Sequence, residues 1–200
     1  MLLNHYLFRK ATIVGIGFMG GSMGLALKKH RLAREVIGLS HRQSSLVNAL
    51  KIKAIDVGHT DLKKALYDAD LVILAAPVES IIKLFSTINP YLKRGCIVTD
   101  LGSTKAKVVE SAEKSLSAPS FYVGSHPLTG SEKQGVENAQ EDLFTNAQCI
   151  MTPTPQTNQV AKEKVKLLWT KIGSQVKFLS PEEHDQNLSY VSHLPHILAY

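Results

Sequence analysis

The chain has 200 residues, of which 44% are hydrophobic and 20% are charged, and its formal net charge is +6. This length fits one ordinary domain, or one domain and part of a second, and the composition provides enough apolar side chains for a core. No apolar run reaches the roughly 18 to 20 residues that a membrane span requires. The N-terminal segment lacks the basic stretch of a secretory signal, so we expect neither a signal peptide nor a membrane partner.

The positive charge raises the question of nucleic-acid binding. The lysines are scattered along helical stretches, for example at Lys28, Lys29, Lys162, Lys164 and Lys166. No basic run is interleaved with aromatic residues, so no nucleic-acid partner is expected. A positive excess also suits a protein that handles an anionic cofactor or substrate, and composition alone does not separate these readings.

The chain contains two cysteines, Cys96 and Cys149, and each lies in an apolar, strand-like run. This placement predicts two buried thiols in a reduced compartment, which indicates a cytoplasmic protein. A zinc site would need closely spaced pairs of ligands, which these positions do not provide, so no metal is expected.

Strand-like and helix-like stretches alternate along the chain. The predicted strands span 11–16, 35–39, 69–77, 96–103, 121–127, 146–154 and 175–180. The predicted helices span 20–30, 43–52, 62–68, 78–92, 104–116, 133–144 and 159–172. The strands are nearly continuous apolar runs, which is typical of parallel strands covered on both faces. The pattern therefore predicts an α/β fold with a doubly wound, mostly parallel sheet of the Rossmann type.

A further helix is predicted to begin at Pro181. Ser180 suits its N-cap, proline suits its first position, and Glu182 and Glu183 suit its first turn. The helical pattern continues to Tyr200. We therefore expect a dinucleotide-binding domain at 1–180 and, at 181–200, the first helix of a second domain.

The stretch GIGFMG places Gly15, Gly17 and Gly20 in a G-x-G-x-x-G pattern between the first strand and the first helix. In that context the first glycine allows a tight turn, the second lets the backbone approach a pyrophosphate, and the third allows close helix packing. The backbone N–H groups near Phe18 and Met19 would complete an anion site at the helix N-terminus. The alternative is a glycine-rich turn that binds nothing.

The end of the second strand bears on which dinucleotide binds. An NAD site usually has a carboxylate there for the ribose 2′-hydroxyl, whereas this chain has Ser40, His41 and Arg42. The serine hydroxyl and the arginine could hold a 2′-phosphate, so we expect NADP to be preferred over NAD. The alternative for Arg42 is a solvated arginine at a helix start. Further along, Ala76 and Pro77 would leave room for the nicotinamide at the sheet edge.

Polar side chains follow several strands at the edge where ligands of such sheets bind. Ser103 follows one strand, His126 ends the next, and Ser131 and Glu132 come soon after. A histidine beside a dinucleotide suits general acid–base chemistry near neutral pH, and the alternative is a residue that fills a turn.

The last helix carries a second group of histidines. His193 and His196 are three residues apart and share a helix face, with Ser189 one turn earlier. This pair lacks a carboxylate at a matching interval, which argues against a metal site. The remaining readings are a role in binding or packing at a domain junction.

Five stretches together resemble the prephenate/arogenate (cyclohexadienyl) dehydrogenase family of tyrosine biosynthesis. They are GIGFMGGSMGLAL, DLGSTK, GSHPLTGSEKQGVENA, LFTNAQCIMTPT and HDQNLSYVSHLPH. The resemblance covers nearly the whole chain in order, and the histidine loop and the last stretch are its specific parts.

The resemblance implies an oxidative decarboxylation of prephenate, arogenate or both. It implies that His126 takes the proton of the 4-hydroxyl while hydride leaves C4 for the nicotinamide of NADP or NAD, and that Ser103 orients this histidine. Ser131, Glu132, His193 and His196 would line the substrate pocket. The family continues into a helical domain that forms a homodimer and supplies an arginine for a substrate carboxylate, and the present chain stops before such a position.

Two other functions stay open from the sequence. GIGFMG also resembles the opening of β-hydroxyacid dehydrogenases, although GSHPLTGSE argues against that group. The second alternative is a regulatory module that binds the dinucleotide without turnover. The choice between prephenate and arogenate is also left open.

Overall fold

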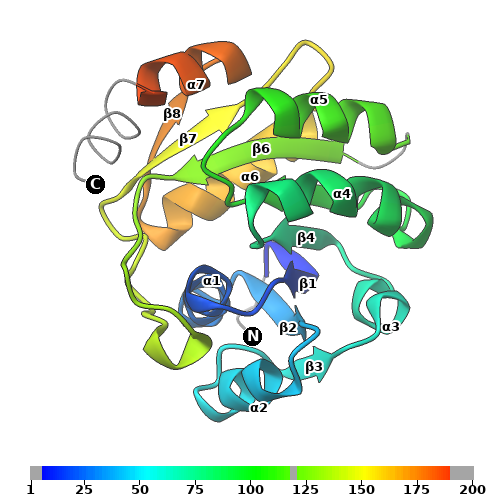
Figure 1. The fold of residues 1–200 in the computed structure, drawn as a ribbon, viewed down its shortest axis with the longest axis vertical. Coiled ribbons are helices and arrows are strands. Elements are labelled where there is room, and N and C mark those ends of the chain that lie inside the picture. The colour runs from blue at the N-terminus through cyan, green and yellow to red at the C-terminus, as the bar shows by residue number, and fades with distance from the viewer. Residues whose placement is uncertain (1–5, 118–120, 190–200) are drawn as a thin grey trace, which may run out of the picture.

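The computed structural model describes residues 6–117 and 121–189 (Figure 1). Within these ranges one eight-stranded sheet has the order β3-β2-β1-β4-β5-β6-β7-β8. The strands are β1 (Phe8–Val14), β2 (Ala33–Leu39), β3 (Val57–His59), β4 (Leu71–Leu74), β5 (Ile97–Asp100), β6 (Phe121–Pro127), β7 (Gln148–Thr152) and β8 (Gln175–Phe178). Only the β6–β7 pair is antiparallel. The predicted doubly wound, mostly parallel sheet is confirmed.

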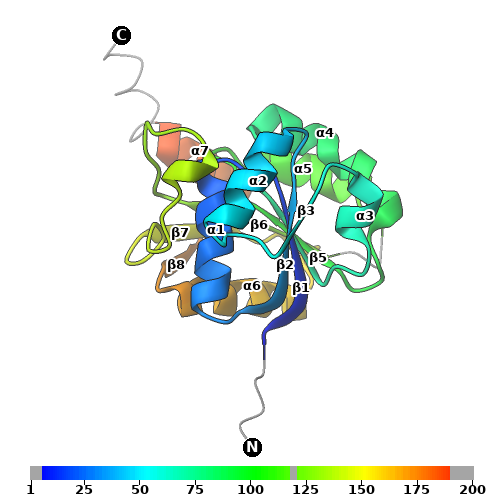
Figure 2. The ribbon, with the colours of Figure 1, turned by 90° about the horizontal axis from the view of Figure 1, so that it is seen from below.

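Helices cover both faces of the sheet (Figure 2). They are α1 (Phe18–Lys29), α2 (Gln43–Lys51), α3 (Leu62–Leu66), α4 (Val78–Ile88), α5 (Ala106–Ser115), α6 (Gln159–Ile172) and α7 (Pro181–Leu188). Two short 3-10 helices span Asn89–Tyr91 and Val136–Asn138. One core lies under α1, α2 and α6, and a second lies under α3, α4 and α5.

The buried strands show why the apolar runs are continuous. In β4, Leu71 and Ile73 belong to the first core, whereas Val72 and Leu74 belong to the second. Successive side chains of a strand point to opposite faces, so a strand covered on both faces needs an apolar residue at every position.

The predicted helix at 133–144 is wrong. The segment contains only the 3-10 helix Val136–Asn138 and turns. Gly135 has φ +85°, and Val136 is buried against α1, where a Cβ at Gly21 would collide with its side chain. The N–H of Gln140 then donates to the hydroxyl of Ser22 at 3.0 Å. Docking onto α1 therefore overrides the helical periodicity of this segment. The sequence reading also missed the three-residue strand β3.

Helix α7 begins as predicted. Ser180 and Glu183 form a capping box, in which the serine hydroxyl accepts from the Glu183 N–H and the glutamate accepts from the Ser180 N–H at 2.8 Å. The helix contacts α5 and β7. The predicted continuation to Tyr200 lies outside the described residues, and the proposed domain boundary after residue 180 stays a prediction.

Both cysteines are buried and are not joined in a disulfide, as predicted. Burial raises the pKa of Cys96 to about 12. Residues 6–117 and 121–189 include no helix long and apolar enough to cross a membrane. The same ranges include no cluster of three or more histidine, cysteine, aspartate or glutamate residues that could hold a metal ion.

Candidate active site

The glycine loop connects β1 to α1 at the carboxyl edge of the sheet. Gly15 has φ +100°, and a Cβ there would overlap the carbonyl oxygen of Ala75. A Cβ at Gly20 would overlap the carbonyl oxygen of Gly15. At Gly17, by contrast, a Cβ would meet no atom within 4 Å. Two glycines therefore allow close packing, and the third leaves the backbone open to a neighbouring cavity.

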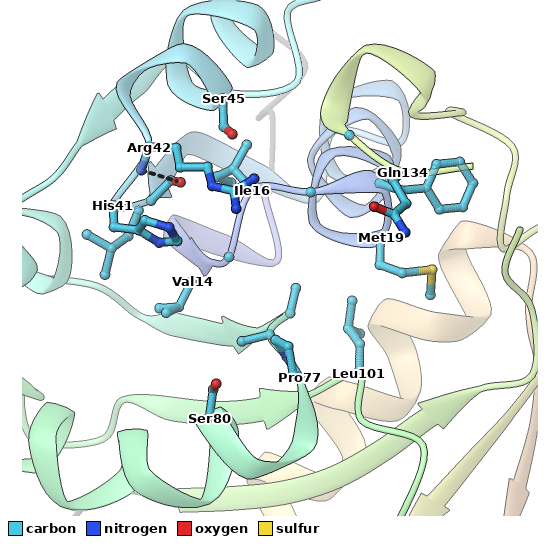
Figure 3. A pocket seen from close by; sticks show the side chains of 18 of the residues that line it. Val14, Ile16, Met19, His41, Arg42, Ser45, Pro77, Ser80, Leu101 and Gln134 are labelled. Carbon is cyan, nitrogen blue, oxygen red and sulfur yellow. Dashed lines mark hydrogen bonds between the residues drawn. The ribbon is translucent and has the colours of Figure 1, made fainter. Parts of the chain in front are cut away.

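That cavity has a volume of about 840 Å³ and lies over the carboxyl ends of β1, β2 and β4 (Figure 3). It is lined by most of the predicted cofactor residues: Gly15, Gly17, Phe18, Met19, Ser40, His41, Arg42, Ala76 and Pro77. The lining also includes Lys133 and Gln134 from the segment between β6 and β7. None of the described residues that line it is acidic, and α1 has no acidic residue in its first turn. The cavity therefore suits an anionic ligand at a helix N-terminus.

The β2 side of this cavity carries the residues predicted to select the dinucleotide. Arg42, His41 and Ser45 lie together on this side in Figure 3. The N–H of Arg42 donates to the hydroxyl of Ser40 at 3.2 Å, which fixes the turn from β2 into α2. The side chain of Arg42 is exposed to solvent at the cavity wall.

A second cavity of about 290 Å³ adjoins the first. Its lining includes Ser103, His126 and Ser131, three of the residues predicted to form the reactive site. Six residues line both cavities: Phe18, Met19, Ala76, Pro77, Leu101 and Ser131. A ligand in the second cavity would therefore lie next to a ligand in the first.

His126 is half-buried at the end of β6 and contacts the first turns of α7. Its Nδ1 lies 2.9 Å from Nε2 of His184, and Nδ1 of His184 lies 2.7 Å from Oδ1 of Asp185. The Asp185 carboxylate also accepts from the N–H groups of Lys105 and Ala106, at 2.7 and 2.9 Å. Three ionisable groups from two distant segments thus form one hydrogen-bonded row.

The ionisation states in this row follow from burial and pairing. Burial lowers the pKa of His184 below its ordinary value, and the neighbouring carboxylate of Asp185 only partly opposes this. Burial opposes ionisation of Asp185, but the amides of Ala106 and Lys105 together with His184 outweigh it, and its pKa is lowered. The row therefore combines a neutral imidazole with a carboxylate.

A second buried network supports the same sheet edge. Asp100, at the end of β5, is ion-paired with Lys105, and both side chains are fully buried. Asp100 also accepts from the N–H of Gly102 at 2.9 Å and from the hydroxyl of Tyr122 at 2.8 Å. Its backbone carbonyl accepts from the Ser125 hydroxyl at 2.7 Å. These bonds hold the loop that carries Ser103 against the strand that carries His126.

Some predicted site residues are not brought into this arrangement. Glu132 is exposed and lines neither of the two cavities described above. Ser189 is exposed and donates to the carbonyl of Gln186 at 2.7 Å. His193 and His196 lie outside the described residues.

Four residues of this arrangement had no role assigned to them from the sequence: His184, Asp185, Asp100 and Lys105. The pair His184-Asp185 near a strongly capped helix start was the available signal. Its contact with His126, however, spans 58 residues of sequence.

A glycine loop that opens α1 at the switch point between β1 and β4 defines the class of nucleotide-binding α/β domains. Residues 23–178 match the family model described as prephenate dehydrogenase, nucleotide-binding domain. The chain therefore belongs to the prephenate dehydrogenase family. This membership separates it from the β-hydroxyacid dehydrogenases that the glycine loop also resembles.

Individual relatives agree with this assignment. The prephenate dehydrogenase of Bacillus subtilis (strain 168) is 38% identical over 188 residues, which cover 94% of this chain and 51% of the relative. The cyclohexadienyl dehydrogenase of Zymomonas mobilis is 32% identical, with 96% of this chain and 66% of the relative covered. The chain thus spans about half the length of the Bacillus relative.

Solved structures share the fold closely. Prephenate dehydrogenase from A. aeolicus, in complex with hydroxyphenyl propionate and NAD+, has a TM-score of 0.90 at 34% identity, over 96% of this chain and 66% of that chain. Arogenate dehydrogenase from Synechocystis has a TM-score of 0.86 at 31% identity, over 93% and 65% respectively.

Proposed function

We propose that this protein catalyses the NAD(P)-dependent oxidative decarboxylation of prephenate, arogenate or both, giving 4-hydroxyphenylpyruvate or tyrosine in tyrosine biosynthesis. The observation that carries this proposal is that His126 lines a cavity sharing six wall residues with the cavity over the glycine loop. This arrangement supports a proton acceptor next to a hydride acceptor. The names of the relatives support the substrate class.

The proposed chemistry divides the work between cofactor and protein. When bound, the nicotinamide would supply the acceptor for the hydride that leaves C4 of the substrate. His126 would accept the proton of the 4-hydroxyl, so that the C4–O bond becomes a carbonyl. The bond from the ring to the carboxylate then breaks, CO2 leaves, and its electron pair makes the ring aromatic. The C4 oxygen would take a proton back from the imidazolium of His126, which restores the 4-hydroxyl group. Aromatisation drives the decarboxylation, so the protein mainly positions the reactants and manages one proton.

The cofactor proposal is NADP in preference to NAD. The open backbone at Gly17 and the lack of acidic side chains among the described lining residues support binding of a pyrophosphate. Ser40 and Arg42 at the end of β2 support a 2′-phosphate, because both can donate to it and no carboxylate there would repel it. His41 and the Ala76–Pro77 turn belong to the same proposed site.

The substrate site is proposed from the second cavity. Ser103 would orient the substrate hydroxyl and His126, and Ser131 would contact the substrate where the two cavities meet. Glu132, His193 and His196 are proposed to line the site on the strength of the family resemblance alone.

The proposal also includes the cellular location and the oligomeric state of the protein. A cytoplasmic location is supported by the two unpaired cysteines, which suit a reducing compartment. A homodimer formed through a helical domain is supported by the family resemblance. Light scattering tests it by measuring the molar mass of the purified protein in solution.

The test of function follows the formation of reduced nicotinamide with prephenate, arogenate and a 3-hydroxyacid in separate assays. We expect turnover with prephenate or arogenate and none with the 3-hydroxyacid. His126→Asn should keep cofactor affinity and lower kcat by about 10²-fold or more. Cofactor binding without turnover of any of the three substrates would favour a regulatory module. A His126→Asn variant with normal kcat would remove this residue from the mechanism.

A further inference from the structure

The hydrogen bonds in the row of side chains from Asp185 to His126 all have the same donor-to-acceptor direction. Asp185 accepts hydrogen bonds from two backbone N–H groups and has a lowered pKa, so it is a carboxylate and can only accept. His184 has no exposed side-chain surface, and its Nδ1 lies 2.7 Å from that carboxylate. Because a carboxylate cannot donate, Nδ1 of His184 must carry the proton.

The position of the proton on His184 determines its position on His126. A neutral imidazole with its proton on Nδ1 has a lone pair on Nε2. Nε2 of His184 lies 2.9 Å from Nδ1 of His126, so it accepts from that nitrogen. The proton of a neutral His126 is then on Nδ1, and its own Nε2 carries the lone pair. Which nitrogen of a histidine can act as a base is set by the bond that the other nitrogen makes.

We propose that His184 and Asp185 are positioning residues that hold His126 in the Nδ1-protonated tautomer, so that its Nε2 accepts the hydroxyl proton of the substrate. The proposal rests on the proposed function for the identity of that substrate. During the step, the substrate O–H bond breaks and a new N–H bond forms at Nε2. His126 then becomes an imidazolium, and the carboxylate of Asp185 stabilises its charge through the neutral ring of His184.

The surrounding backbone makes this row suitable for positioning. Asp185 accepts from the first amides of α5, which follow the loop that carries Ser103. His184 belongs to α7, its side chain is buried, and its two ring nitrogens contact His126 at the end of β6 and Asp185. The row thus joins helix α5, helix α7 and the strand that carries the base.

The first test reads the tautomers directly by nuclear magnetic resonance. Spectra that correlate the ring protons and ring nitrogens of labelled histidine, recorded on the purified chain at mildly alkaline pH, distinguish Nδ1–H from Nε2–H. His126→Asn identifies the signals of His126 by their loss. We expect Nδ1–H for both His126 and His184. A wild-type His126 with its proton on Nε2 would overturn the proposal.

The second test uses three substitutions. In Asp185→Asn the side chain is neutral and can present either its amide oxygen or its amide nitrogen to His184, so the Nδ1–H tautomer of His184, and with it that of His126, is no longer enforced. In His184→Leu the acceptor for His126 is lost, whereas in His184→Gln the amide oxygen can still accept from His126 and the amide nitrogen can still donate to Asp185. The exposed carboxylate on the same helix provides a matched control, Glu182→Gln.

We expect Asp185→Asn and His184→Leu to lower kcat by about tenfold or more, with KM for the dinucleotide unchanged. His184→Gln should restore most of kcat and the Nδ1–H signal of His126, and Glu182→Gln should match the wild type. Equal losses in the leucine and glutamine variants, with the tautomer unaltered in both, would show a merely structural role.

The two tests separate this proposal from the proposed function. The tautomer assignment needs no turnover, so it is decided even where the chain converts none of the three substrates. Conversely, turnover with an Nε2–H wild-type His126 would keep the proposed function and reject the row as its positioning device.

Discussion

Lys105 is ion-paired with Asp100 in the interior of the protein, and neither side chain has any exposed surface. The pair closes the loop between β5 and α5, and Asp100 also holds the strand that carries His126 through Ser125. A buried charge is costly unless it is paired and hydrogen-bonded, so each member of this pair depends on the other.

Removing the cation should therefore destabilise the protein strongly. We expect Lys105→Met to lower the free energy of unfolding by about 3–5 kcal/mol, because Asp100 is left as an uncompensated buried charge. Urea unfolding measures this change. Lys107→Met, at an exposed position on the same helix, is the control and should have little effect. A loss no larger than that of the control would contradict a structural role for the pair.

Substitutions at two glycines of the loop should have different effects, one on packing and the other on ligand binding. We expect Gly20→Ala to lower the free energy of unfolding by about 1–3 kcal/mol, because its Cβ would overlap the Gly15 carbonyl. Gly17→Ala should leave stability unchanged, since its Cβ meets no atom within 4 Å. It should nevertheless weaken dinucleotide binding by about tenfold or more, equivalent to about 1.4 kcal/mol. Thermal unfolding and titration calorimetry test both expectations.

The choice of dinucleotide should depend on Arg42. We expect Arg42→Ala to weaken NADP binding by about 1.5–3 kcal/mol, the usual worth of a hydrogen bond to a charged group, and to leave NAD binding unchanged. Values of kcat/KM for the two cofactors provide the measurement. Arg34→Ala, an exposed arginine at the start of β2, is the control. Equal or better use of NAD that Arg42→Ala does not alter would refute the NADP preference.

The buried histidine should make stability depend on pH. Burial lowers the pKa of folded His184 below the ordinary value of 6.5, so below that pH the unfolded state binds more protons than the folded state. The contribution of His184 to stability is therefore present above about pH 6.5 and is lost as pH falls toward the folded pKa. Among the described residues, the charges of Asp185, Lys105 and Asp100 act on His184.

Urea unfolding across a pH series tests this linkage. His184→Gln should reduce the loss of stability on acidification below about pH 6.5, because the substituted side chain does not titrate. His41→Gln, at an exposed histidine, should keep the wild-type slope. A wild-type slope in His184→Gln would rule out this residue as the source.

Much of the fold could be read from the sequence because it depends on near neighbours. The glycine loop was found from the spacing of three glycines after an apolar run, and the predicted bounds of 121–127 and 159–172 agree with β6 and α6. The helix prediction for 133–144 failed because the conformation of this segment depends on a residue far away in the sequence. Its helical periodicity competes with the docking of Val136 onto Gly21 of α1, a contact that no local pattern contains.

The sequence by itself determined the alternation of strands and helices, the glycine loop and His126 as the residue to examine, because each is written in spacing along the chain. Only the tertiary structure decided which groups His126 meets. His184 lies 58 residues away from His126 in the sequence, and the ion pair of Asp100 with Lys105 joins the end of a strand to the start of a helix. The physical reason is that burial and charge pairing depend on distant segments coming together, and those contacts set the proton positions on which the proposed chemistry depends.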